Sequence, residues 1–415
     1  MQVTENETKL ILSRRLRRST ADFGKYLSTK GKQNLIIIAA LICLIFIFTL
    51  LNSNFLNSYN IVSMAQGLAP YAIMSLGVTF DIATGGIELS IGTVGIASAV
   101  LAGKLYSTNT IPLFLVVPLM ILFGTIFGLI NGFLIAHLKL PPFIATLGTM
   151  MFARGFSALL VGVPNIFYPS DNWFKTTFSN ANDFPIGLVW VFGLMLICMY
   201  IMYKNKIGRY ILSIGSNEEA TRLSGINTKK YKIIAYTISG MFAGIAAIFW
   251  AASFSTVATA TGNGMELDAI AGVYIGGTSA AGGIASITGS VIGSLMLVVI
   301  RNGLNFALAA FNINLNATYV TYVLTGIIVV VAVLLDVIKN NNANKVRIET
   351  PLQKAKKAYK EELEFLQNQL DIVVSDKTLN YHEKIKVESE LRLKIQDLKN
   401  KNKENIKELK KKEGK

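Results

Sequence analysis

The chain has 415 residues, of which 52% are hydrophobic, with a mean hydropathy of +0.47 and a formal net charge of +15. This composition excludes an ordinary soluble globular protein and predicts a chain that lies mostly in lipid. Because 8 of the 40 Lys and Arg residues precede residue 34 and 20 follow residue 338, we interpret the charge as attachment to an anionic inner leaflet and not as nucleic-acid binding.

The first 33 residues are predicted to form a basic cytoplasmic segment. The first apolar run begins at Leu35, and no small-residue cleavage site follows Leu51. A retained first membrane span, held by positive charge, is therefore favoured over a removable export signal.

Apolar stretches recur from Leu35 to Ile338 at about the 20 residues that a helix needs to cross a bilayer. Ten candidate spans follow in chain order: 35–51, 61–81, 89–106, 111–137, 142–162, 186–203, 232–254, 265–281, 284–300 and 318–338. We predict an all-α polytopic membrane protein whose transmembrane domain covers residues 34–338, with Gly-rich broken or re-entrant segments. A re-entrant hairpin within 265–300 would give the same topology.

The distribution of basic residues predicts the orientation of these spans. With a cytoplasmic N-terminus, the inside segments contain 16 Lys and Arg residues, whereas the outside loops contain only Lys104, Lys175 and Arg301. This asymmetry satisfies the positive-inside rule. We therefore expect a multi-pass protein of the bacterial plasma membrane with both termini in the cytoplasm.

Charged residues within or beside the apolar stretches are the candidate site. The segment GGIELSIG (85–92) and the segment GMELD (264–268) each place a glutamate between glycine and leucine. Intramembrane charges commonly line a polar path or pair with one another, and glycines that interrupt a helix free backbone groups for the same purpose. The predicted translocation-path residues are Asp81, Gly85, Gly86, Glu88, Ser90, Arg154, Glu266 and Asp268.

Two other interpretations of these charges stay open. Glu88 and Glu266 are equally well explained as carboxylates at helix N-termini, where the helix dipole favours them. Arg154 is a hypothetical partner for one of these acids, and no pattern in the sequence selects which one.

Glycines recur at four-residue spacing in three places. Gly124, Gly128 and Gly132 form one such row, Gly240 and Gly244 a second, and Gly289 and Gly293 a third. Small residues at this spacing let helix backbones approach closely in lipid. We predict that these rows are close-packed helix seams.

Two polar segments interrupt the spans. Residues 163–185 are aromatic and contain three prolines, which suits either a docking surface for an external partner or an interfacial aromatic belt. Residues 204–232 are long and basic, and there Asn217 is a candidate N-cap, Glu218 and Glu219 suit a first turn, and Gly225 suits the end of a short helix.

Residues 339–415 form a charged tail with 20 basic and 13 acidic residues. Apolar positions recur every three or four residues before and after a polar break at Ser375 and Asp376. This periodicity predicts two amphipathic cytoplasmic helices, in a hairpin or coiled coil. A solvated helix without a specific role is the alternative to contact with an ATPase, a partner permease or lipid.

Four segments together resemble a known family. GGIELSIG, PPFIATLGTMMFARG (141–155), GRYILSIGSNEEATRLSGI (208–226) and YIGGTSAAGGIASITGSVIG (274–293), in this order, are similar to the permease subunits of ribose-type ABC importers over residues 35–338. Glu88 departs from the aspartate more usual in the family, and the long tail is not typical of it.

The resemblance implies a translocator for ribose or a related pentose or hexose. It also implies a second permease copy or homologue, two cytoplasmic ATPase subunits that use ATP and Mg, and an external sugar-binding protein. This chain itself would bind no cofactor. By the same resemblance, a coupling helix that docks on the ATPase contains Gly215, Asn217, Glu218, Glu219, Ala220 and Gly225.

Enzymatic activity is not expected. The sequence contains no P-loop, no HExxH and no clustered His or Cys that would form a metal or nucleophile site. Two alternatives remain: a permease for a nucleoside or a furanosyl signalling molecule, and an ion-coupled secondary transporter that uses the intramembrane acids.

Overall fold

The computed structural model describes residues 34–162, 165–170, 173–181, 184–259, 261–311, 313, 315–344, 351–375 and 380–412. The basic segment predicted at residues 1–33 lies outside them. The chain divides into two compact units, Met1–Asn340 and Asn341–Lys415, and each is described by itself.

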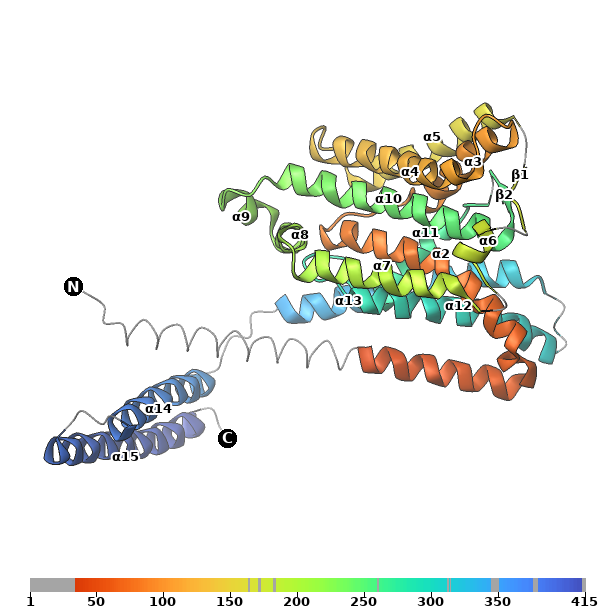
Figure 1. Cartoon of the computed structure of the whole chain (residues 1–415). Helices are drawn as coiled ribbons and strands as arrows, with labels where there is room; N and C mark the ends of the chain where they lie inside the picture. The colour runs from red at the N-terminus through yellow and green to blue at the C-terminus, as the bar shows by residue number, and fades with distance from the viewer. Residues whose placement is uncertain are drawn as a thin grey trace. The chain divides into compact units, whose positions relative to one another are not determined.

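The first unit is a bundle of helices (Figure 1). In chain order its elements are a helix at Asn34–Leu51, η1 (Ser53–Leu56), α2 (Ser58–Ala83), α3 (Ile91–Ser107), α4 (Leu113–Ala136), α5 (Pro142–Val161), β1 (Asn165–Phe167), α6 (Trp173–Phe178), α7 (Ile186–Tyr203), α8 (Lys206–Ser216), α9 (Glu218–Leu223), α10 (Thr228–Phe254), β2 (Thr256–Ala258), α11 (Met265–Ile275), α12 (Ile287–Ala310) and α13 (Ala317–Asn344).

Eight helices in the described part of the chain are long and apolar enough to cross a membrane. They are the helix Asn34–Leu51, α2, α4, α5, α7, α10, α12 and, within α13, Tyr319–Ile338. The apolar helix α3 is shorter, at 17 residues. The prediction of an all-α polytopic membrane protein is confirmed.

One of the ten predicted spans ends early, and an irregular break separates two others. The predicted helix over 265–281 is wrong in its length, because α11 has 11 residues and covers about 16 Å, roughly half of a bilayer core. Residues 276–286 form a loop that contains Gly277, Gly282 and Gly283 at positive φ, a conformation that ends a helix. A second break, residues 84–90, separates α2 from α3 and contains Gly85 at φ +82°.

The predicted glycine seams hold the bundle together. A Cβ on Gly124 would overlap the carbonyl oxygen of Gly240, and one on Gly293 would overlap that of Gly272. The rows on α4 and α10 therefore face each other at backbone contact, and the row on α12 faces α11. In lipid, this close packing replaces the hydrophobic effect as the force between helices.

A small cap of aromatic residues covers the end of the bundle where α10 stops. β1 pairs with β2 in antiparallel register, with Ile166 opposite Val257. Phe174 of α6 is fully buried and Phe178 packs edge-on against Phe249 of α10. Much of the aromatic content of the 163–185 segment is thus internal packing, while Phe167 stays exposed on the cap.

The second unit contains two helices, α14 (Pro351–Ser375) and α15 (Tyr381–Lys412), which lie side by side (Figure 1). Leu391 and Ile395 are buried. The predicted pair of tail helices is confirmed, whereas Asp376, in the predicted break, lies outside the described residues.

Candidate functional site

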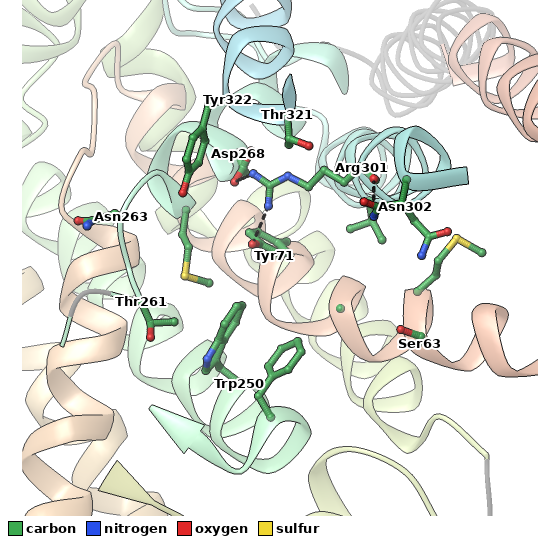
Figure 2. A pocket seen from close by; sticks show the side chains of 16 residues that line it. Ser63, Tyr71, Trp250, Thr261, Asn263, Asp268, Arg301, Asn302, Thr321 and Tyr322 are labelled. Carbon is green, nitrogen blue, oxygen red and sulfur yellow. Dashed lines mark hydrogen bonds and ion pairs between the residues drawn. The ribbon is translucent and has the colours of Figure 1, made fainter. Parts of the chain in front are cut away.

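A cavity of about 430 Å³ opens between α2, α10, α11, α12 and α13 (Figure 2). Trp250 and Phe254, from the last two turns of α10, line it. The cavity therefore lies toward the end of α10 that bears the β1–β2 cap, whereas α9 precedes the opposite end. We call it the outer cavity; its lining comprises Ser63, Met64, Gly67, Tyr71, Trp250, Phe254, Thr261, Asn263, Met265, Asp268, Val298, Arg301, Asn302, Asn305, Thr321 and Tyr322.

A buried ion pair forms one wall of the outer cavity. Asp268, only 3% exposed, accepts a hydrogen bond from Arg301 of α12. Arg301 also donates to the Tyr71 hydroxyl at 2.8 Å, and its guanidinium lies 5.1 Å from the centre of that ring. Removing one member of such a pair leaves the other charge buried without compensation, which is costly.

Two nitrogen donors at this wall remain without a hydrogen bond in the described part of the chain: Arg301 Nε and Trp250 Nε1. A buried donor without an acceptor is costly. Both nitrogens belong to residues that line the outer cavity, and the aromatic side chains of Trp250 and Tyr322 line it as well. The outer cavity thus has the polar and aromatic composition of a small-molecule site.

Arg301 lies inside a helix and not in an outside loop, contrary to the prediction from the sequence. It was assigned to an outside loop because the predicted span ended at residue 300, but α12 continues to Ala310. The helix can carry this charge inside the bundle because Asp268 and Tyr71 satisfy it. An arginine in an otherwise apolar run was the available signal for an intramembrane partner of an acid.

Glu266 lies at the junction of the two Gly-Xaa-Glu-Leu segments. Its Oε1 accepts from the backbone N–H of Gly264 at 3.2 Å, and its Oε2 would lie 3.0 Å from a Cβ on Gly92. The segments 85–92 and 264–268, which are distant in sequence, are therefore packed against each other. The first bond agrees with the interpretation of Glu266 as a helix N-terminal carboxylate.

Arg154 forms no ion pair among the described residues. Its Nη2 donates to the Thr93 hydroxyl at 3.2 Å, and its charge acts on Glu266 electrostatically. The assignment of Arg154 as a direct partner of an acid is therefore replaced by an indirect one through the first turn of α3.

Glu88 is buried in the break between α2 and α3. Its Oε1 accepts from the backbone N–H of Ser90 at 2.6 Å and from the Ser90 hydroxyl at 2.5 Å, and its Oε2 accepts from Asn131 Nδ2 at 3.0 Å. Three donors thus satisfy this carboxylate at the start of α3. Asn131 was not identified from the sequence, although a lone amide in an apolar run was a signal.

Asp81 is fully buried one turn before the break. Gly86 lies directly under the hydroxyl of Tyr236, because a Cβ there would overlap that oxygen. Of the eight predicted path residues, Asp268 alone lines the outer cavity. The other seven do not line it: Gly85 is exposed, Arg154 is partly buried, and the remaining five are buried. They are Asp81, Gly86, Glu88, Ser90 and Glu266.

The segment predicted as a coupling helix is a short helix, as expected. In α9 the Asn217 side chain accepts from the Ala220 N–H at 2.9 Å, and Gly225 follows at φ +82°. Glu219 and Arg222 pair on its exposed surface, and that hydrogen bond and charge lower the pKa of Glu219. Lys232 of α10 contacts Glu218 at 2.6 Å.

α8 connects this segment with the two irregular stretches at residues 84–90 and 276–286. A Cβ on Gly215 would overlap the carbonyl oxygen of Ala83 and the amide of Gly283, and the Gly283 N–H donates to Ala83 O at 3.0 Å. The loop that contains Gly283 is fixed further on, where Asp336 of α13 accepts from the Ala280 N–H at 2.8 Å. α8 therefore contacts the end of α2 and the loop that follows α11.

Comparison with known proteins identifies the type of chain. The profile of a family described as the branched-chain amino acid transport system / permease component matches residues 60–333. The ribose import permease protein RbsC of Haemophilus influenzae is 35% identical over 303 residues, which cover 72% of this chain and 91% of that protein.

Other relatives are import permeases as well. RbsC of Bacillus subtilis is 33% identical, over 71% of this chain and 90% of that protein. The galactose/methyl galactoside import permease protein MglC of Escherichia coli is 32% identical, over 73% and 94%. No solved structure matches the chain significantly.

Proposed function

This chain belongs to the family of transport-system permease components, and we propose that it translocates a monosaccharide, ribose or a related pentose or hexose, as the membrane subunit of an ATP-driven importer. The observation that carries the sugar assignment is the wall of the outer cavity, where the Asp268–Arg301 pair lies beside Trp250 and Tyr71. The relatives named for ribose and galactose import support the same class of substrate.

The chemistry of the outer cavity suits a weak sugar contact. A monosaccharide presents hydroxyl groups that both donate and accept, and Arg301 Nε and Trp250 Nε1 are donors in need of acceptors. Because Asp268 is already paired with Arg301, the wall carries no net charge from these two residues. Such a wall holds a neutral solute loosely and lets it pass, while tight recognition belongs to an external sugar-binding protein.

Coupling to ATP hydrolysis is assigned to α9. We place the contact with a cytoplasmic ATPase subunit on its exposed surface around Glu219, and ATP and Mg belong to that partner. Gly215 at the end of α8 touches the backbone of Ala83 and Gly283, so displacement of α9 reaches both breaks through one rigid helix. A second permease copy or homologue completes the proposed assembly, with the exposed aromatic side chains of the cap toward the binding protein.

A charge swap on α9 tests this proposal. The tagged chain is purified from its own membranes in mild detergent as wild type, Glu219→Arg, and the double variant Glu219→Arg/Arg222→Glu. We expect a P-loop ATPase to travel with the wild type and to be lost from Glu219→Arg. The double variant restores the pair within α9, so recovery of the ATPase would assign the loss to helix stability instead of the interface.

The substrate is tested separately by uptake into proteoliposomes. The reconstituted importer with its binding protein should take up a labelled pentose or hexose only with ATP inside. ATP-dependent uptake of a nucleoside but of no free sugar would replace the substrate class. Uptake that follows an imposed ion gradient without any ATPase would replace the whole proposal by an ion-coupled transporter.

A further inference from the structure

Beneath the break between α2 and α3 lies a group of buried polar side chains that the proposed sugar path does not use. We call Asp81, Glu88, Asn131, Tyr236 and Ser239 the buried oxygen cluster. They come from four places in the sequence: α2, the break, α4 and α10. None is more than 3% exposed, so solvent does not satisfy them.

The atoms of this cluster that lack a partner are all oxygens. Both carboxylate oxygens of Asp81 make no hydrogen bond of good geometry within the described residues, and the same holds for Asn131 Oδ1, Tyr236 OH and Ser239 Oγ. The amide nitrogen of Asn131 is already used, because it donates to Glu88 and to Ser90. The atoms that remain without a partner are the oxygens of one carboxyl group, one amide and two hydroxyl groups.

These oxygens lie near one another. Ser239 is beside the Asp81 carboxylate, and the charges of Asp81 and Glu88 act on each other and on the Tyr236 hydroxyl. Gly86 lets that hydroxyl approach the backbone of the break, since any Cβ would overlap it. Native interiors rarely leave so many polar atoms unpaired in one place.

The cluster contains two carboxyl groups and no basic side chain. Glu88 is satisfied by three donors, but Asp81 has no cationic partner among the described residues. Asp81 also lies in the last turn of α2, where the helix dipole is negative and disfavours a carboxylate. A buried carboxyl group in this situation is neutralised either by a bound cation or by a proton.

We propose that the buried oxygen cluster binds a monovalent alkali cation, for which Na⁺ is the probe. Carboxylate, amide and hydroxyl oxygens are the ligands that hard cations prefer. The C-terminal end of a broken transmembrane helix is a recurrent place for such an ion. A monovalent ion matches one ionised carboxylate, and Asp81 is the ligand because its oxygens are unpaired while those of Glu88 already accept hydrogen bonds.

The bound cation would join α2 to α4 and α10 directly above the contact between Ala83 and Gly215. It would thereby set the stiffness of the break that α8 touches. This inference does not depend on the identity of the transported solute, and its test measures binding instead of uptake.

The experiment uses the full-length chain in detergent at constant ionic strength. Its thermal unfolding midpoint is measured as NaCl, KCl or LiCl replaces choline chloride, and ²²Na⁺ binding is measured directly. We expect saturable binding and a saturable rise of the midpoint. Asp81→Asn should abolish both, while remaining at least as stable as the wild type in choline chloride.

Two milder variants keep the test decisive if Asp81→Asn does not fold. Tyr236→Phe and Ser239→Ala should each weaken the apparent affinity for the cation by about tenfold or more, by analogy with the loss of metal-site partners. Ser98→Ala is the matched control, because Ser98 is buried in α3 and donates only to the carbonyl of Val94 in its own helix.

Three outcomes would overturn the proposal. One is the absence of ²²Na⁺ binding and of any cation effect, which would assign the unpaired oxygens to ordered water or a protonated carboxyl. A second is cation stabilisation that persists undiminished in Asp81→Asn. A third is a response to Ca²⁺ or Mg²⁺ alone, which would make the site divalent.

Discussion

The outer cavity and the buried oxygen cluster each bury an aspartate, yet they leave it in opposite states. Asp268 is held by Arg301 and stands at the wall of an open cavity, whereas Asp81 is enclosed among oxygens. Both residues look alike in the sequence, as acids in apolar runs. The comparison teaches that the partner of an intramembrane carboxylate, and not its burial, distinguishes the proposed solute path from the proposed cation site.

The largest effect should come from breaking the pair in the outer cavity. Arg301→Met leaves Asp268 buried and unpaired, which should destabilise the chain by about 3–5 kcal/mol. The double variant Arg301→Met/Asp268→Leu should recover most of that loss, because no charge is then stranded. Unfolding midpoints of the detergent-purified chain measure both, and equal destabilisation by the single and double variants would contradict the pairing.

A loss of stability of intermediate size is expected from a substitution at Gly86, in the break between α2 and α3. Gly86→Ala forces a methyl group against the Tyr236 hydroxyl and should cost about 1–3 kcal/mol of stability by overpacking. Adding Tyr236→Phe removes that oxygen and should restore stability. The cycle sharpens the comparison because its rescue relieves a steric overlap, whereas the rescue in the outer cavity removes a stranded charge. Additive losses in the double variant would show that Gly86 and Tyr236 are not in contact.

The smallest effect is expected at Trp250, where a substitution should change sugar transport without changing stability. Trp250→Phe removes an Nε1 donor that has no partner in the described chain, so the unfolding midpoint should stay unchanged. Sugar KM in the reconstituted importer should rise by roughly 2–10-fold, the equivalent of one neutral hydrogen bond.

Trp190→Phe is the matched control for that variant. Trp190 Nε1 donates to the Thr177 carbonyl at 2.9 Å, so its loss should lower stability by about 1 kcal/mol and leave the sugar KM unchanged. The reverse pattern in the two variants would remove Trp250 from the sugar path.

Much of the helical architecture could be predicted because its signals are local. Hydropathy placed most spans within a few residues of the observed helices, and the glycine rows on α4, α10 and α12 identified their own seams. The α9 helix was predictable for the same reason, since Asn217 caps it and Gly225 follows it within eight residues. The α12 boundary failed where a charge, Arg301, is neutralised by residues that are far away in the sequence.

Hydropathy, capping and glycine spacing are properties of short stretches of chain. They suffice to predict the membrane class, most of the helices and the acidic residues that lie within apolar stretches. Only the packed bundle decided that Asp268 meets Arg301 and Tyr71 while Asp81 meets Tyr236 and Ser239. The reason is physical: the free energy of a buried carboxyl group depends on the groups that surround it in space. Those groups are more than 150 residues away for Asp81, and for Asp268 they are Arg301, 33 residues away, and Tyr71, 197 residues away.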